Sequence, residues 1–157
     1  AEVTIEQMEE QYEFVSSINK TINDAHQSIK KIRKINTQLE AFVKQYEKDE
    51  AVKKLVDRAT ELKKSFEDIE KALYQTKNKS NQDPLNFPIR LTNKLGHLNR
   101  LVTGSDFPPT AQDEAVRKEL TLKIEEHMLH YNELISKDLE QFNAAFAKLK
   151  LDYLTLK

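Results

Sequence analysis

Apolar side chains recur along the first third of the chain at steps of mostly three and four residues, with polar residues between them. This spacing is the signature of an amphipathic helix with one apolar face. The pattern continues for about 40 residues, which corresponds to about 60 Å of helix. The predicted face consists of Ile5, Met8, Tyr12, Val15, Ile18, Ile22, Ala25, Ile29, Ile32, Leu39, Val43 and Tyr46.

A second apolar stripe follows a polar turn around residues 46–50, and its steps alternate strictly between three and four. Such a heptad repeat is typical of the seam of a helical bundle or coiled coil. Because the connection is short, the first two helices should pack as antiparallel neighbours. The stripe comprises Val52, Leu55, Ala59, Leu62, Phe66, Ile69 and Leu73.

The segment from Lys77 to Pro88 holds two of the four prolines and has no periodicity, which predicts a loop. A third helix is expected to have Pro88 in its first turn and to end at Gly104, which we expect to form a left-handed C-cap. The apolar stripe of this helix is Leu91, Leu95, Leu98 and Val102.

The last helix should begin near Ala111, because Thr110 and Asp113 resemble a capping box. It extends for about 45 residues, judged from the length of its apolar periodicity. The stripe comprises Val116, Leu120, Ile124, Met128, Tyr131, Ile135, Leu139, Phe142, Phe146, Leu149, Tyr153 and Leu156.

These elements predict an all-α fold: an elongated antiparallel four-helix bundle with two long and two shorter helices, forming one domain over residues 1–157. A three-helix, spectrin-like bundle is the alternative, in which the second and third helices form one broken leg. Periodicity leaves both open. The chain opens Ala-Glu-Val-Thr-Ile-Glu, with no initiator Met and no signal-peptide pattern. We therefore expect a processed protein or a fragment of a larger one.

The composition excludes several classes of site. The chain has 2 Gly, 4 Pro, no Cys and no Trp. Gly-rich phosphate loops need more closely spaced glycines, and a chain without cysteine has no disulfide, thiolate metal site or Cys nucleophile. The formal net charge of -1 provides no general attraction to nucleic acid or to an anionic membrane. No cofactor is expected.

Histidines provide the candidates for metal chemistry. A di-iron bundle needs a Glu three residues before a ligating His, and the residues at that position are Asn23, Lys94, Ile124 and His127, none of them acidic. His127 and His130, with Glu125 or Glu126, share a helical region and form the alternative hypothesis of a metal-binding bundle. Histidines beside an apolar stripe are more commonly solvated surface residues than metal ligands.

Enzymatic function has no local support, because no Ser lies in the strained, Gly-flanked turn of a hydrolase nucleophile. The densest basic run, Lys30 to Lys34, is interpreted as a solvated helix face. The amphipathic helices could also lie on a lipid surface. Balanced polar faces and near-zero net charge favour mutual packing instead, so membrane binding is not expected.

The segment from Phe87 to Thr110 departs from this regularity. It contains Asn-Phe-Pro-Ile-Arg-Leu-Thr-Asn-Lys-Leu-Gly-His-Leu-Asn and then Gly-Ser-Asp-Phe-Pro-Pro-Thr-Ala-Gln. It resembles a segment near the C-terminus of large bacterial proteins with sortilin-type or Asp-box propellers, often labelled glycosyl-hydrolase-like. The resemblance is best from about Phe87 to Asn143. The matched positions are Asn93, Lys94, Leu95, Leu98, Asn99, Asp106, Pro109, Thr110 and Gln112.

The resemblance implies a noncatalytic helical accessory domain that packs on the propeller of its parent protein or engages another protein. It also implies an extracytoplasmic location and places any glycosidase chemistry outside this chain. From the residues alone, Asn93 and Asn99 can hydrogen-bond the neighbouring loop, while Asp106 and Thr110 can cap helix ends. The candidate interaction surface comprises Arg90, Asn93, Lys94, Asn99, Asp106, Pro109 and Thr110.

Overall fold

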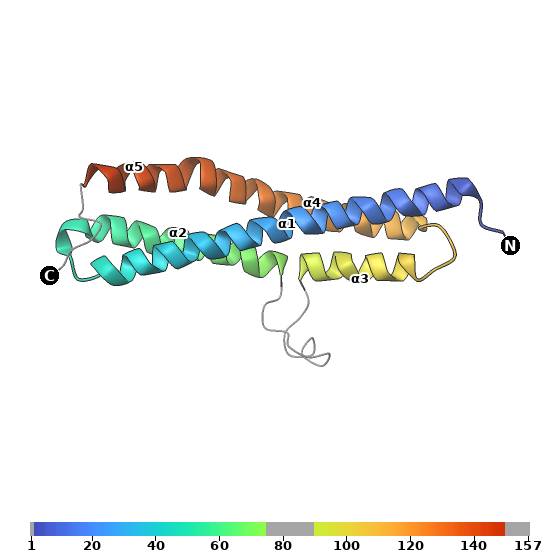
Figure 1. The fold of residues 1–157 in the computed structure, drawn as a ribbon, viewed down its shortest axis with the longest axis horizontal. Coiled ribbons are helices and arrows are strands. Elements are labelled where there is room, and N and C mark those ends of the chain that lie inside the picture. The colour runs from blue at the N-terminus through green and yellow to red at the C-terminus, as the bar shows by residue number, and fades with distance from the viewer. Residues whose placement is uncertain (1, 75–89, 150–157) are drawn as a thin grey trace, which may run out of the picture.

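The computed structural model describes residues 2–74 and 90–149, and every regular element in these ranges is helical (Figure 1). The all-α prediction is therefore confirmed. The predicted loop at 77–88 and the predicted final turns at 150–157 lie outside the described residues. The elements are α1 (Ile5–Tyr46), a 3₁₀ turn η1 (Glu50–Val52), α2 (Lys53–Leu73), α3 (Leu91–Thr103), α4 (Ala111–Glu133), a π-helical segment η3 (Leu134–Leu139) and α5 (Glu140–Lys148).

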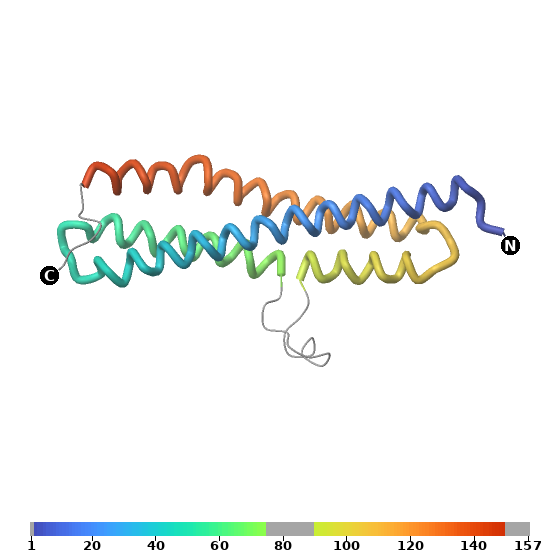
Figure 2. Tube along the Cα trace, viewed as in Figure 1, coloured from blue at the N-terminus to red at the C-terminus, as the bar shows by residue number. Residues whose placement is uncertain are grey.

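Side-chain contacts define how α2 and α3 lie along α1. The Gln11 side-chain amide donates to the Val102 carbonyl at 2.8 Å, and the Asn99 amide donates to Asn19 Oδ1 at 3.1 Å. Farther along α1, Arg33 pairs with Glu70 of α2. As the residue number along α1 rises, the residue number of its contact partner falls, first within α3 and then in α2. Both helices are thus antiparallel to α1 and follow one another end to end, as Figure 2 shows.

The last leg runs parallel to α1. Near the start of α4, the Arg117 guanidinium donates to Ser17 Oγ at 3.2 Å. Near the other end of α1, the rings of Phe42 and Phe142 meet edge to face with centroids 5.4 Å apart. Residue numbers in the two legs rise together, so α4, η3 and α5 return alongside α1 (Figure 1).

The described residues therefore form three legs, as in the alternative in which the second and third helices make one broken leg (Figure 1). The expectation that the second and third helices would form two separate legs is corrected. The physical reason is length. The 42 residues of α1 offer an apolar face that neither the 21 residues of α2 nor the 13 residues of α3 can cover alone. Placed end to end, the two helices together cover most of it.

The core lies between the three legs, and its most completely buried large side chains come from all of them. The stripe predicted for α2 is confirmed at every position. The most buried large residues are Ile18, Ile32, Phe66, Ile69, Leu73, Leu95 and Ile124.

The predicted stripe is wrong at the first turns of α1. Ile5 is 71% exposed, Met8 51% and Tyr12 74%, whereas Phe14, which lay outside the predicted stripe, is 3% exposed. Burial on α1 begins with Phe14, just past the level of Gln11, where α3 ends. Tyr12 also lies past this level, but two residues of helix turn it to another side of α1 than Phe14.

The last leg contains a π-helical segment that periodicity did not predict. From Val116 to Phe146 the stripe makes eight steps over 30 residues, whereas eight turns of α-helix contain about 29 residues. A π turn accommodates one additional residue, and η3 provides it. Leu134 is consequently buried, while the predicted Ile135 is only partly buried.

The helix ends agree with prediction at one point and differ at another. The capping box is confirmed: Asp113 N–H donates to Thr110 Oγ1 at 3.1 Å, and Thr110 N–H donates to Asp113 Oδ2 at 2.8 Å. The left-handed cap at Gly104 is wrong, since its φ is -79° and its ψ is -2°. The end of α3 needs no such cap, because the side-chain amide of Gln11 in α1 donates hydrogen bonds to the carbonyls of Val102 and Ser105.

Where α2 ends and α3 begins, a buried hydroxyl joins the two helices. Thr92 Oγ1 donates to the Leu73 carbonyl at 2.8 Å, which satisfies one of the carbonyls that a helix C-terminus leaves unpaired. This bond lets the second leg change helices without an unsatisfied polar group in the core.

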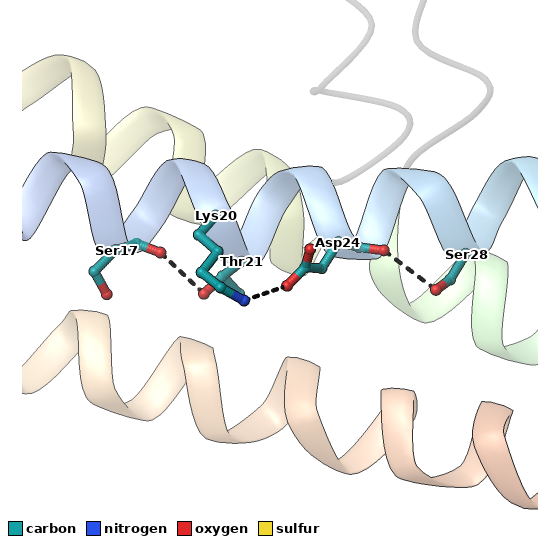
Figure 3. Close-up of polar contacts among 5 residues, drawn as sticks. All are labelled: Ser17, Lys20, Thr21, Asp24 and Ser28. Atoms are coloured by element: carbon teal, nitrogen blue, oxygen red, sulfur yellow. Dashed lines mark hydrogen bonds and ion pairs between the residues drawn. The ribbon is translucent and has the colours of Figure 1, made fainter.

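The side of α1 that faces α4 carries small polar residues, and Figure 3 shows how they are satisfied. Thr21 donates to the Ser17 carbonyl at 3.1 Å, and the buried Ser28 donates to the Asp24 carbonyl at 3.2 Å. Lys20 and Asp24 form an ion pair at 2.8 Å. These groups bond within α1 itself, so α4 packs against a strip without unmet hydrogen bonds at these positions.

Candidate protein-binding surface

The first turns of α1 extend beyond both of the other legs (Figure 1). On one side, α3 ends at Thr103, level with Gln11. On the other side, α4 begins at Ala111, six residues before Arg117, which reaches Ser17; in a parallel register this start also lies level with residue 11. Residues 5–10 therefore project by about 9 Å at ~1.5 Å per residue.

The projecting turns carry an exposed apolar row. Ile5, Met8 and Tyr12 are spaced by three and four residues and so lie on one side of the helix. Asn19, seven residues after Tyr12, lies on that same side and contacts Asn99 of α3. The row thus continues the face that packs against α3, past the point where α3 ends.

Phe107 belongs to the same end of the molecule. It lies in the connection between α3 and α4, two residues after Ser105, whose carbonyl accepts from Gln11, and it is 73% exposed. We call Ile5, Met8, Tyr12 and Phe107 the end surface. Exposed apolar residues are ordinary when they are scattered singly, whereas a group of large ones at one place marks an interaction site.

Acidic side chains border the end surface. The first thirteen residues contain five glutamates, no Lys and no Arg, and all five are exposed: Glu2, Glu6, Glu9, Glu10 and Glu13. Within residues 2–74 and 90–149, none of these carboxylates forms an ion pair; the first basic residue, Lys20, pairs with Asp24. The border is therefore a source of uncompensated negative potential.

A cleft of about 510 Å³ lies beside the projecting turns, between α1 and the start of α4. Arg117 is its basic residue, and its guanidinium is fully engaged: it pairs with Glu114 at 2.9 Å, donates to Ser17 and lies 5.7 Å from the Phe14 ring centroid. Glu10 and Glu13 also line the cleft. The cleft therefore adds to the acidic character of this end.

The residues predicted as an interaction surface fall into two groups at opposite ends of α3. At its start, the Asn93 side-chain oxygen accepts from Arg90 N–H at 3.4 Å, inside the first turn. Lys94 and Arg90 line a shallow cleft of about 270 Å³. The 13 residues of α3 place this group about 20 Å from the other end of the helix.

The second group lies near the end surface. Thr110 caps α4, Pro109 lines the acidic cleft, and Asp106 lies between Ser105 and Phe107 in the same connection. The expectation that Asn99 hydrogen-bonds the neighbouring loop is corrected, because its side chain donates to Asn19 of α1. Asn99 lies inside α3, and its side chain faces α1 there. The sequence thus indicated this end through Asp106, Pro109 and Thr110 but assigned Ile5, Met8 and Tyr12 to the core.

The histidines of the metal hypothesis lie in a basic setting. His127 lines the same cleft as Arg90 and Lys94, together with Lys123 and Glu126. His130 is exposed. Three basic side chains against one carboxylate oppose cation binding there. Among the residues that the structure describes, no three His, Asp or Glu side chains are grouped so as to hold a metal ion.

His26 lies in a small cleft of about 190 Å³ with Lys30, Arg33 and Tyr74. Its ring meets that of Tyr74 edge to face at 5.5 Å. Burial, followed by the charges of Lys30 and Arg33, lowers the pKa of His26 below its ordinary value. Its buried Nε2 has no hydrogen-bond partner within the described ranges. This environment favours the neutral form of the imidazole.

Comparison of the chain with protein-family models, with curated proteins and with solved structures finds no match. The resemblance to Asp-box propeller proteins stays a prediction. Within the described residues, no helix is both long and apolar enough to cross a membrane.

Proposed function

We propose that this chain is a noncatalytic helical module that binds another protein through its end surface. The observation that supports the proposal is the exposure of Ile5, Met8, Tyr12 and Phe107, each more than half exposed, at one end of the bundle. Burying large apolar side chains is the main favourable term in protein association. Nothing in the described clefts assembles a comparable set of groups for catalysis.

The proposal is tested by differential capture from an extract of the source organism. The immobilised wild-type chain is compared with Met8→Ala/Tyr12→Ala, and with Leu122→Ala/Leu129→Ala as a matched control. Both control residues are about as exposed as the end surface but lie on α4. We expect proteins that the wild type and the control retain and the end-surface variant loses. Identical captured sets for all three chains would contradict the proposal.

The parent protein is a separate part of the proposal and rests on the sequence resemblance alone. In the proposed parent, an exported bacterial protein, the module follows an Asp-box propeller. Any glycosidase chemistry belongs to that propeller. The complete open reading frame tests this directly, because Asp-box repeats upstream of this chain are either present or absent.

A further inference from the structure

We infer that the end surface binds a basic amphipathic helix of another polypeptide, aligned along the exposed row of α1. This inference rests on the proposed function and adds the chemistry of the partner. Three observations carry it: the geometry of the row, the row of acids beside it, and the way α3 already packs on the same face of α1.

The geometry selects a helix as the occupant. Ile5, Met8 and Tyr12 form a straight ridge over seven residues, or about 10 Å of helix. Ridges of this kind pack into the grooves of a second helix. Farther along the same side of α1, α3 is that second helix, and it ends level with Gln11. A partner helix would lie along this side of α1, next to the connection of residues 104–110 that follows α3 (Figure 1).

The charges select a basic helix. Glu6, Glu9 and Glu13 are spaced by three and four residues within α1, so they form one row. Glu9 is four residues after Ile5 and three before Tyr12, which places this acidic row directly beside the apolar one. A partner with a leucine-type stripe and Lys or Arg along one border would match both rows. Such rim charges accelerate association and make it dependent on salt.

The same charges disfavour two other occupants. Two copies of the chain meeting through this end would bring their five-glutamate borders together, and like charges across an interface oppose association. An anionic lipid surface would repel the acidic border in the same way. Self-association and membrane binding therefore become outcomes that the experiment must detect.

The probe is a synthetic peptide of about 18 residues, held helical by a side-chain cross-link, with leucines at i, i+3 and i+7 and lysines along one border. Its matched control replaces every lysine by glutamate. Binding to the full chain is measured by fluorescence anisotropy at about 20 mM and about 300 mM salt. We expect saturable binding of the basic peptide that weakens with salt, and no binding of the acidic one.

Two variants locate the binding. Met8→Ala/Tyr12→Ala should lower the affinity for the basic peptide by at least about tenfold. Leu122→Ala/Leu129→Ala should leave this affinity unchanged. Glu9→Lys/Glu13→Lys should reverse the preference and bind the acidic peptide instead. Thermal unfolding of each variant establishes that it is folded.

Several results would overturn the inference. These are equal binding of the two peptides, equal binding to wild type and to Met8→Ala/Tyr12→Ala, sedimentation of the wild type as a dimer that this variant abolishes, and flotation with anionic vesicles. If extract capture finds a partner specific to the end surface but the basic peptide does not bind, the proposed function stands and the partner chemistry is wrong. If both fail, both are wrong.

Discussion

The projecting first turns of α1 and the turns that follow them carry the same three-and-four apolar spacing but differ in burial. Ile18 is completely buried, whereas Ile5, the same residue type thirteen positions earlier in the same helix, is 71% exposed. Two things differ. Ile5 precedes residue 11, near which α3 and α4 begin to flank α1, and thirteen residues at about 100° per residue place it on a different side of the helix from Ile18. A periodic stripe therefore identifies a face that is able to pack, and the position and length of the other legs decide whether it does.

Replacing the two isoleucines breaks this comparison most directly. Ile18→Ala should lower the free energy of unfolding by about 2–5 kcal/mol, because it removes buried methylenes and leaves a cavity. Ile5→Ala should change it by less than about 0.5 kcal/mol, as a solvent-exposed substitution does. Urea denaturation measures both. Similar losses for the two variants would mean that the projecting turns are packed in solution.

The second test asks whether the packed region is continuous where the second leg changes from α2 to α3. Thr92→Val keeps the side-chain shape but removes the donor to the Leu73 carbonyl, leaving a buried acceptor unpaired. The expected loss is about 1–3 kcal/mol in the free energy of unfolding.

Thr103→Val is the matched control, because Thr103 is exposed and its hydroxyl bonds only within its own helix. It should cost less than about 0.5 kcal/mol. If Thr92→Val were as mild as this control, the junction between α2 and α3 would have to be solvated rather than buried.

The third test concerns the space between α1 and α3 in the packed region. A Cβ at Gly96 would lie 3.8 Å from Ile22 Cδ1 and 3.9 Å from the Arg100 guanidinium, which are ordinary contacts. Gly96→Ala should therefore stabilise the chain, by up to about 1 kcal/mol from helix propensity. Thermal unfolding measures the gain; a lower midpoint than wild type would show that α1 approaches α3 more closely than these distances.

Sequence reasoning worked best where local physics decides the outcome. The seven-residue stripe of α2 is buried throughout because both of the other legs run past it, and Thr110 caps α4 because its partner, Asp113, is only three residues away. It failed where distant residues decide. Gly104 needs no left-handed cap because Gln11, far away in sequence, donates to the carbonyls of Val102 and Ser105 at the end of α3. No local pattern reveals that contact.

The candidate site was partly accessible to the same reasoning. Asp106, Pro109 and Thr110 lie at the end of the bundle that carries the end surface, but Ile5, Met8 and Tyr12 matched the core period and were assigned to the core. One signal distinguishes them in retrospect: five glutamates and no Lys or Arg accompany the row over residues 2–13. Sequence alone could not locate the ends of α3 and α4 along α1, nor show that the row lies to one side of the buried face that begins with Phe14.

The smallest expected effect concerns a polar group in the packed region, His26. Its cleft contains the positive charges of Lys30 and Arg33 from α1, with Arg33 paired to Glu70 of α2, and the Tyr74 ring. Burial and these charges lower the pKa of the folded-state imidazole. The unfolded chain therefore binds a proton more readily as the pH falls through about 6.5. By linkage, protonation then favours the unfolded state, and stability decreases toward acid pH.

Substitution isolates this contribution from that of the other titrating groups. The free energy of unfolding is measured by urea denaturation at about pH 8 and about pH 5.5, on either side of the ordinary histidine pKa. Wild type should lose more stability over this pH interval than His26→Gln, whose side chain at position 26 does not titrate. His97, His127 and His130 are common to both chains, so their contributions cancel in the difference. Equal losses for wild type and His26→Gln would contradict the burial of the His26 ring against Tyr74. The bundle would then be open to water around His26, as it is at the projecting turns of α1.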